Sequence, residues 1–356
     1  MESILYKLVV MKKEKKNTPS KMRLPAPMLL LLIAIYSLTI YFMTAETKPQ
    51  LPEQSVPIRL YSNQAGDDLR ETYTHAINEA KESITCLIYS LTDEEIIAAL
   101  RKKADEGIKV FIVCDPVATQ DAATKLGPKI QVIPRRQKGL MHNKLLVIDS
   151  KVSWLGSANF TRDSLSLHAN IVMGISSKAI ASAIEEKAKS LSLKGRKIEP
   201  LILATPDQTL ELSFLPDDTK ALKKLVAQLA AAKKTIKVAM FTFTHPELIN
   251  ALVDAHKRGV DVEIVIDSDS SRKTSSIAYQ RFLREKMQVY ASKRVGLLHE
   301  KMAIIDDTTL IMGSANWTRA AFGQNSENLS FLTDLTSDQR AKLKSFWATT
   351  KLECEQ

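Results

Sequence analysis

One short stretch occurs twice in this 356-residue chain. Both copies read H-x-K, four residues, D, six residues and then G-S-A-N, and neither copy contains a gap. The recurring polar residues are His142, Lys144, Asp149, Ser157 and Asn159 in the first copy and His299, Lys301, Asp306, Ser314 and Asn316 in the second. A single H-x-K-x4-D arises by chance in roughly a few per cent of chains of average composition. Two copies with the same downstream tetrapeptide therefore indicate a duplicated functional element.

The arrangement resembles the duplicated signature of the phospholipase D superfamily, whose members break phosphodiester bonds through a histidine. The resemblance covers residues from about Leu60 to Phe346. It implies the reaction type, which is cleavage of a phosphodiester, but leaves the substrate open.

The chain alternates strand and helix patterns. The apolar run from Ile84 to Leu91 predicts a strand, the spacing over Glu94 to Glu106 predicts a helix, and Ile108 to Cys114 predicts a second strand. The same series of patterns recurs 152 residues later, where Asp267 occupies the position that corresponds to Asp115. A repeat of this length is a duplicated domain, and its pattern predicts an α/β fold with sheets flanked by helices. The resemblance implies that the two domains pack as a pseudo-twofold dimer within one chain, so a dimer of chains is not required.

The N-terminal region predicts membrane attachment. Residues 28–45 form an uncharged run of 18 residues, close to the ~20 that a bilayer-spanning helix needs. The tail before it carries seven basic and two acidic residues, or +5 of the formal charge of +10. The positive-inside rule then places the catalytic domains on the non-cytoplasmic side of the membrane. If translation begins at Met22, the run resembles a cleaved secretory signal instead. The expected divisions are a tail (1–27), an anchor or signal (28–45), a linker (46–57), the first domain (58–187), a connector (188–210) and the second domain (211–356).

The cysteines indicate neither a disulfide framework nor a metal site. Cys86, Cys114 and Cys354 lack the spacing of metal ligands, and the first two lie in runs that we expect to be neighbouring strands. We expect Cys86 and Cys114 to be buried free thiols. No cofactor and no metal requirement are expected.

The motif places an imidazole and an ammonium side by side. His142 and Lys144 are two residues apart at the start of a predicted strand, so their side chains point to the same face. His299 and Lys301 repeat this arrangement. The following Asp149-Ser150-Lys151 and Asp306-Asp307 read as hairpin turns. Family signatures count Asp149 and Asp306 with the catalytic residues, whereas the spacing predicts that they support the shape of the motif.

The resemblance implies a mechanism with two histidines. One attacks phosphorus to give a covalent phosphohistidine, and the other protonates the departing alcohol. We expect His142 to be the nucleophile and His299 the general acid. The groups expected to hold the phosphate oxygens are Lys144, Lys301, Ser157, Asn159, Ser314 and Asn316.

The two histidines differ in a predicted partner. Superfamily members commonly carry an acidic or amide residue about fourteen positions after the motif glycine, where it orients the histidine of the opposite half. Here these residues are Glu327 and Asn170. The resemblance thus implies that Glu327 holds His142 and that Asn170 meets His299. A carboxylate partner strengthens an imidazole as a nucleophile, which favours His142 for that role.

Three substrates remain open. A membrane-anchored phospholipase D acting on glycerophospholipids is favoured by the hydrophobic segment and by the apolar pairs Leu140-Met141 and Leu297-Leu298 before the histidines. A nuclease is the second hypothesis, since the basic segment from Lys129 to Lys138 can follow a phosphate backbone. A phosphatidyltransferase of the cardiolipin synthase type is the third. A non-enzymatic binding module would leave both histidines without a role. The expected partner is a phospholipid membrane, with nucleic acid as the alternative substrate.

Overall fold

The structure is a computed structural model that describes residues 27–28, 48–193 and 197–355. Residues 29–47, which hold nearly all of the predicted anchor or signal segment 28–45, lie outside the described part, as does the basic tail. Among the helices in the described ranges, none has the length and apolar character needed to span a bilayer. Residues 48–356 form one compact unit, and this unit carries both copies of the motif.

The first half is built on a mixed sheet of seven strands. The order is β1-β7-β6-β5-β2-β3-β4, in which β2, β3 and β4 run parallel and the remaining neighbours are antiparallel. The strands are β1 (Ile58–Ser62), β2 (Ser83–Ile88), β3 (Lys109–Cys114), β4 (Gln131–Pro134), β5 (Lys144–Ile148), β6 (Val152–Gly156) and β7 (Ile171–Ser176). Every residue of β5 is buried, which accounts for the unbroken apolar run from Leu145 to Ile148. The predicted strands over 84–91 and 108–114 are confirmed as β2 and β3.

Helices connect these strands and cover the sheet. The short helix η1 (Asn63–Ala65) follows β1, and the α-helices are α2 (Leu69–Asn78), α3 (Glu94–Asp105), α4 (Ala122–Leu126), α5 (Arg162–Ser166) and α6 (Lys178–Leu193). The predicted helix over 94–106 is α3, which begins after Asp93 because that side chain accepts hydrogen bonds from the free N–H groups of Glu95 and Ile96.

The second half repeats this plan with an eight-stranded sheet. Its order is β12-β11-β10-β13-β14-β15-β9-β8. The strands are β8 (Leu201–Ala204), β9 (Thr209–Leu215), β10 (Thr235–Met240), β11 (Asp261–Ile266), β12 (Gln288–Ala291), β13 (Lys301–Ile305), β14 (Thr309–Gly313) and β15 (Glu327–Thr333). The helices are α7 (Ala221–Ala231), α8 (Pro246–Lys257), α9 (Ser268–Arg272), α10 (Ser276–Arg284), α11 (Arg319–Gly323) and α12 (Ser337–Glu355). The duplicated α/β fold expected from the sequence is confirmed.

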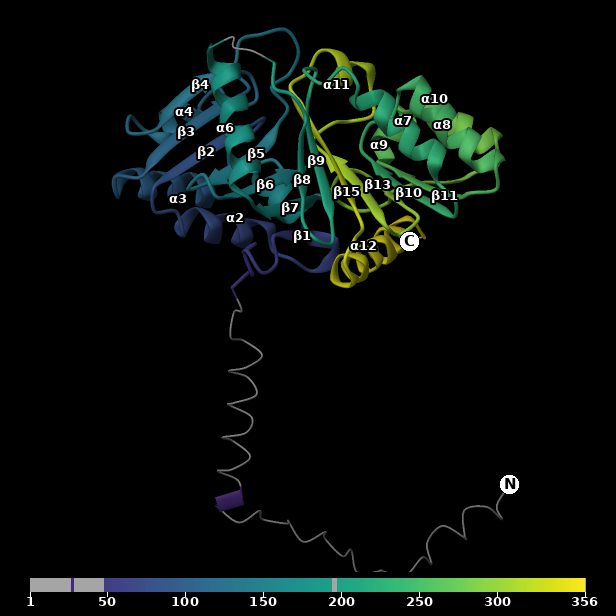
Figure 1. The fold of residues 1–356 in the computed structure, drawn as a ribbon, viewed down its shortest axis with the longest axis horizontal. Helices are drawn as coiled ribbons and strands as arrows, with labels where there is room; N and C mark the ends of the chain where they lie inside the picture. Colours follow the sequence, from purple (N-terminus) through teal and green to yellow (C-terminus); the bar gives the residue numbers. More distant parts are fainter. Residues whose placement is uncertain (1–26, 29–47, 194–196, 356) are drawn as a thin grey trace, which may run out of the picture. The chain divides into compact units, whose positions relative to one another are not determined.

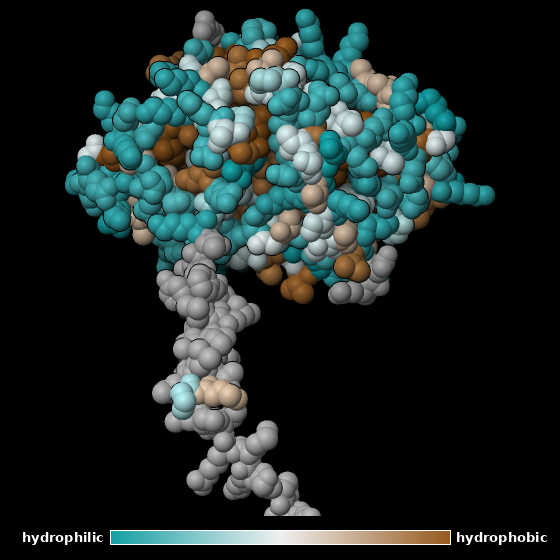
Figure 2. All heavy atoms as spheres, turned by 60° about the horizontal axis from the view of Figure 1, so that its bottom comes forward, coloured by the Kyte–Doolittle hydropathy of each residue, from teal (hydrophilic) through white to brown (hydrophobic). Residues whose placement is uncertain are grey.

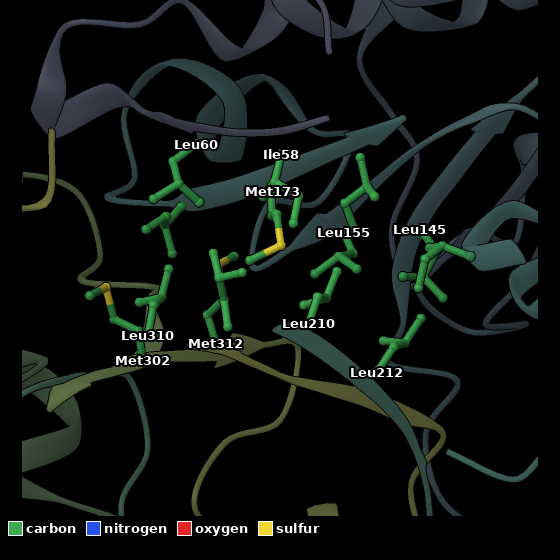
Figure 3. Close-up of a cluster of buried hydrophobic side chains, with 14 of the residues drawn as sticks. Ile58, Leu60, Leu145, Leu155, Met173, Leu210, Leu212, Met302, Leu310 and Met312 are labelled. Atoms are coloured by element: carbon green, nitrogen blue, oxygen red, sulfur yellow. The ribbon is translucent and has the colours of Figure 1, made fainter. Parts of the chain in front are cut away.

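The two halves share a hydrophobic core. Helices α2 and α3 cover the outer face of the first sheet, and α7, α8 and α10 cover that of the second (Figure 1). Between the sheets lies a continuous cluster of buried side chains from both halves (Figure 3), among them Leu145, Leu155, Met173, Leu210, Leu212, Met302, Leu310 and Met312. Helices α6 and α12 contribute to the same cluster, so the halves are held together by apolar burial.

Apolar side chains are concentrated inside, and the surface is mostly polar. In the view of Figure 2 the described surface is largely hydrophilic, with scattered apolar side chains. Cys86 and Cys114 lie on the neighbouring strands β2 and β3 and are buried free thiols, as expected, and Cys354 is also buried.

The motif aspartates end their strands in tight turns. Asp149 and Ser150 adopt positive φ angles of 53° and 51°, as Asp306 and Asp307 do at 52° and 53°, which matches the turn that joins twisted antiparallel strands. The Asp149 carboxylate accepts hydrogen bonds from the backbone N–H groups of residues 81–83, and Asp306 does the same for residues 233–235. Each aspartate therefore fastens its turn to the start of the neighbouring strand, at the opposite end of the motif strand from the histidine.

Replacing Asp149 with Asn tests this supporting role. Asparagine tolerates positive φ but removes the charge that strengthens the backbone hydrogen bonds. We expect Asp149→Asn to lower the free energy of unfolding by about 1–2 kcal/mol, measured by urea denaturation. The kcat of the folded enzyme should fall less than about 3-fold, because this energy is lost far from the histidines. A large loss of kcat with unchanged stability would contradict the assignment.

Candidate active site

The two motif histidines are held by backbone contacts between the halves. The His142 N–H donates to the carbonyl of Ser326, at 2.9 Å, and the His299 N–H donates to the carbonyl of Ala169, at 3.0 Å. These bonds belong to short parallel bridges, Met141 with Ser326 and Ala169 with Leu298. Each histidine therefore takes its position from the opposite half, and neither half forms the site alone.

A carboxylate orients the first histidine. Nδ1 of His142 lies 2.8 Å from Oε2 of Glu327, which belongs to the other half. Glu327 is fully buried and also accepts hydrogen bonds from the Ser314 hydroxyl, at 2.6 Å, and from the Asn325 amide, at 3.2 Å. With Nδ1–H donated to Glu327, the lone pair on Nε2 is free to react.

A neutral amide orients the second histidine. Nδ1 of His299 lies 3.0 Å from Oδ1 of Asn170, again across the halves. The Asn170 amide donates to the Ser164 carbonyl, at 2.7 Å, which fixes Oδ1 toward the imidazole. The Ser157 hydroxyl donates to the same Oδ1, at 2.8 Å. The contacts expected from the resemblance, Glu327 with His142 and Asn170 with His299, are both present.

The two motif serines hold these orienting residues. The sequence predicted that Ser157 and Ser314 bind substrate, but both side chains are fully buried and donate to Asn170 and Glu327. The serines therefore hold Asn170 and Glu327, which in turn orient the two imidazole rings.

The motif lysines are buried beneath aromatic rings. Lys144 Nζ donates to the carbonyl of His142, at 2.7 Å, and Lys301 Nζ donates to that of His299. Each Nζ also lies 5.0 Å from the centre of a ring, Tyr89 for Lys144 and Phe241 for Lys301, within cation–π range. Tyr89 and Phe241 touch His142 and His299 edge-on or tilted, at 5.0 and 5.2 Å.

Burial of these cations together lowers their pKa values. Burial brings the pKa of Lys144 down to about 7, although Glu327 and Asp115 oppose the shift. Burial and then the neighbouring Lys144 hold the pKa of Lys301 well below its ordinary value. The pKa of His142 is lowered by burial, with Glu327 opposing, and that of His299 is lowered further by burial and by both lysines. A bound anion is the partner that would restore these positive charges.

Two amide oxygens in the site lack a protein partner. The Oδ1 atoms of Asn159 and Asn316 are buried and accept no hydrogen bond from the described residues. Their amides can still face a ligand, since both residues are only half-buried. The preceding Gly156 and Gly313 are required by packing, because a Cβ there would lie 2.3 Å or less from the carbonyl oxygen of Ile171 or Asn328 on the next strand.

Two aspartates and two aromatic residues were missed as site residues. Asp115 accepts from the N–H of Met141 and Asp267 from that of Leu298, each at 3.1 Å, so each fixes the residue before a histidine. Both are buried. The signal was available, because Asp115 and Asp267 recur at matched positions of the repeat, as do Tyr89 and Phe241. In the described ranges no group of three or more His, Cys, Asp or Glu side chains is arranged to hold a metal ion.

Comparison with known proteins identifies the family. The sequence matches the family described as "Cardiolipin synthase, PLD-like domain" over residues 73–192 and 225–347, one match for each half. The chain belongs to the phospholipase D superfamily. The two matched ranges contain both histidines, both lysines and both orienting residues, Asn170 and Glu327.

Individual relatives agree with this assignment. The chain is 35% identical over 133 residues to a mitochondrial cardiolipin hydrolase of Xenopus laevis, covering 37% of this chain and 62% of that protein. It therefore spans less than two thirds of that relative. It is 26% identical over 302 residues to cardiolipin synthase A of Pseudomonas putida (strain GB-1), covering 74% of this chain and 62% of that protein. A phosphatidylserine synthase structure from Haemophilus influenzae Rd KW20 shares the fold, with a TM-score of 0.65, 13% identity, and coverage of 88% of this chain and 90% of the other.

Anion binding should be coupled to proton uptake. The pKa of Lys144 is about 7 in the free protein and rises when an anion binds beside it. At pH 8 the free amine is mostly neutral, so binding of tungstate should take up protons, and affinity should fall as pH rises from 7 to 9. Isothermal titration calorimetry in buffers of different ionisation enthalpy measures this uptake.

The control variant is Lys144→Gln, which cannot gain a proton at this position. We expect it to take up about one proton fewer at pH 8 and to bind tungstate about 10-fold more weakly. Equal proton uptake by both proteins would show that Lys144 is not the group that gains a proton when the anion binds.

Proposed function

We propose that the protein is a phospholipase D-type phosphodiesterase that hydrolyses glycerophospholipids to phosphatidic acid and a free headgroup. The observation that carries the proposal is the pair of opposed imidazoles, each oriented at Nδ1 by the other half. With both Nδ1 atoms occupied, both Nε2 atoms are available to a phosphodiester. Attack and leaving-group protonation take place on opposite sides of phosphorus, and two histidines from two halves meet this requirement.

We assign the roles from the difference between the two partners. The Glu327 carboxylate increases the basicity of His142, which therefore acts as the nucleophile. Asn170 gives His299 no such charge, so the protonated ring is a stronger acid and protonates the leaving alcohol. The lysines and the amides of Asn159 and Asn316 would stabilise the non-bridging oxygens, in a site where burial strengthens each electrostatic contact.

A membrane lipid is the preferred substrate. The named relatives act on or make phospholipids, as their names state, and the predicted hydrophobic segment 28–45 would hold the enzyme at a bilayer. We infer association with a membrane through this segment, with the catalytic halves on the non-cytoplasmic side, or secretion if the segment is cleaved. Nucleic acid and transfer to an alcohol remain as outcomes of the test.

The test compares substrates and variants in one assay. The full chain, with and without chelator, is incubated with phospholipid vesicles and, separately, with labelled single- and double-stranded DNA and RNA. Chelator-resistant formation of phosphatidic acid with intact nucleic acid is the expected result. Chelator-resistant cleavage of nucleic acid with intact lipid would instead identify a nuclease.

Both histidines should be required. We expect His142→Ala to lower kcat by about 10⁴-fold or more and His299→Ala by about 10³-fold, because one forms the covalent bond and the other transfers a proton. The phosphorylated intermediate should be detected by mass spectrometry in His299→Asn and be absent in His142→Asn. The reverse pattern would exchange the two roles, and near-normal activity in either Ala variant would overturn the two-histidine mechanism.

A further inference from the structure

A third histidine stands beside the active site at a position where the halves differ. His168 lies two residues before Asn170, and its counterpart Asn325 lies two residues before Glu327. Both residues lie just before a strand, β7 in the first half and β15 in the second. The halves therefore offer an imidazole on the His299 side and an amide on the His142 side.

Both ends of the Asn325 amide form hydrogen bonds within the protein. Its Oδ1 accepts from the N–H of Leu140, at 3.1 Å, and its Nδ2 donates to Oε1 of Glu327, at 3.2 Å. Through these two bonds it links the loop before His142 to the carboxylate that orients the same ring. Its amide has a structural role and is not offered to a ligand.

The ring of His168 has no such engagement. The backbone N–H of His168 donates to the Asp163 carbonyl, at 2.7 Å, and the neighbouring Leu167 carbonyl accepts from Arg294, at 2.8 Å, so the loop is fixed. The half-buried ring lies 6.1 Å from the ring of His299, tilted by 45°. Within the described ranges neither ring nitrogen has a protein hydrogen-bond partner. At this ring separation a single water-sized oxygen can lie within hydrogen-bond distance of one nitrogen of each imidazole.

The surroundings keep this ring neutral at pH 7. Burial chiefly lowers the pKa of His168, and Arg294 and Lys301 lower it further, whereas Asp163 and Asp267 oppose them. A neutral imidazole has one nitrogen that accepts a hydrogen bond. His168 can therefore act as an acceptor next to His299, the residue that activates the incoming nucleophile.

We infer that His168 accepts a hydrogen bond from the attacking water and thereby favours hydrolysis over transfer to an alcohol. The inference rests on the proposed function and deepens it by naming water as the molecule that receives the phosphatidyl group. Water has two O–H bonds, so it can donate one to His299 and the other to His168. A simple alcohol has one O–H bond, which His299 uses, and gains nothing from His168.

The step is balanced without any further reactant. The oxygen of water forms a bond to phosphorus while the bond from phosphorus to Nε2 of His142 breaks and returns its electron pair to the ring. The proton from the first O–H of water passes to His299. The second O–H keeps its proton and is only held by His168, which is therefore a specificity-determining residue and transfers no proton.

The test measures the partition of one intermediate. The full-length protein is incubated with phosphatidylglycerol vesicles and ethanol, and the ratio of phosphatidic acid to phosphatidylethanol is measured. Because both products arise from the same phosphohistidine, the ratio does not depend on the fraction of folded enzyme. We expect His168→Ala and His168→Phe each to lower the ratio by about 3- to 10-fold, the effect of one neutral hydrogen bond.

The matched control is His75→Phe on helix α2, a half-buried histidine on the outer side of the first half, which should leave the ratio unchanged. An unchanged ratio in both His168 variants overturns the inference. A shift with Phe but not with Ala also overturns it, since that pattern reports the bulk and apolar character of the new side chain and not the loss of a hydrogen bond. A wild-type protein that cleaves no phosphodiester would instead defeat the proposed function itself.

Discussion

The site depends on burying two ammonium groups and two imidazoles together. Burial of cations is unfavourable unless anions accompany them, and here Glu327 is the carboxylate in direct contact with a motif histidine. The lowered pKa values of all four groups follow from this imbalance. A phosphodiester supplies the negative charge that is lacking, so the same arrangement that opposes ionisation in the free protein favours binding of an anion.

The fold tolerates the burial of these four groups because each half stabilises the other. The shared apolar core fixes the two sheets against one another, and at the site the backbone N–H of each histidine donates across the halves. Asp115 and Asp267 then fix the residues before the histidines. Each ring is thus held just before a buried core strand, β5 or β13, by hydrogen bonds from the opposite half, and such fixed placement is the condition for electrostatic stabilisation without reorganisation during the reaction.

The duplication is symmetric in geometry and asymmetric in chemistry. Lysine, histidine and the amide after the strand recur in both halves, whereas Glu327 takes the position of Asn170 and Asn325 takes the position of His168 in the repeat. Each difference lies at the orienting group or beside it. Identical halves would give two equivalent imidazoles, while these substitutions let one ring attack phosphorus and the other handle protons.

The sequence predicted much of this because its signals were local and repeated. The strand and helix patterns, the doubled motif and the turns at Asp149 and Asp306 all follow from short-range periodicity and spacing. Ser157 and Ser314 were predicted to bind substrate, but in the structure both are buried and donate to Asn170 and Glu327. This burial depends on how the next strand packs, which the spacing of the motif does not reveal. His168 gave no signal, since its proximity to His299 depends on how the two halves pack, which no spacing along the chain reveals.

The configuration at phosphorus distinguishes two histidines that act in sequence through a covalent phosphohistidine from direct hydrolysis by water. The full-length protein cleaves a phospholipid whose phosphorus is chiral because it carries isotopic oxygen or sulfur. The configuration of the product is then determined by ³¹P NMR. Each in-line displacement inverts phosphorus, so attack by His142 followed by attack by water or alcohol predicts net retention. Net inversion would mean that water attacks the substrate directly, and it would rule out the phosphohistidine.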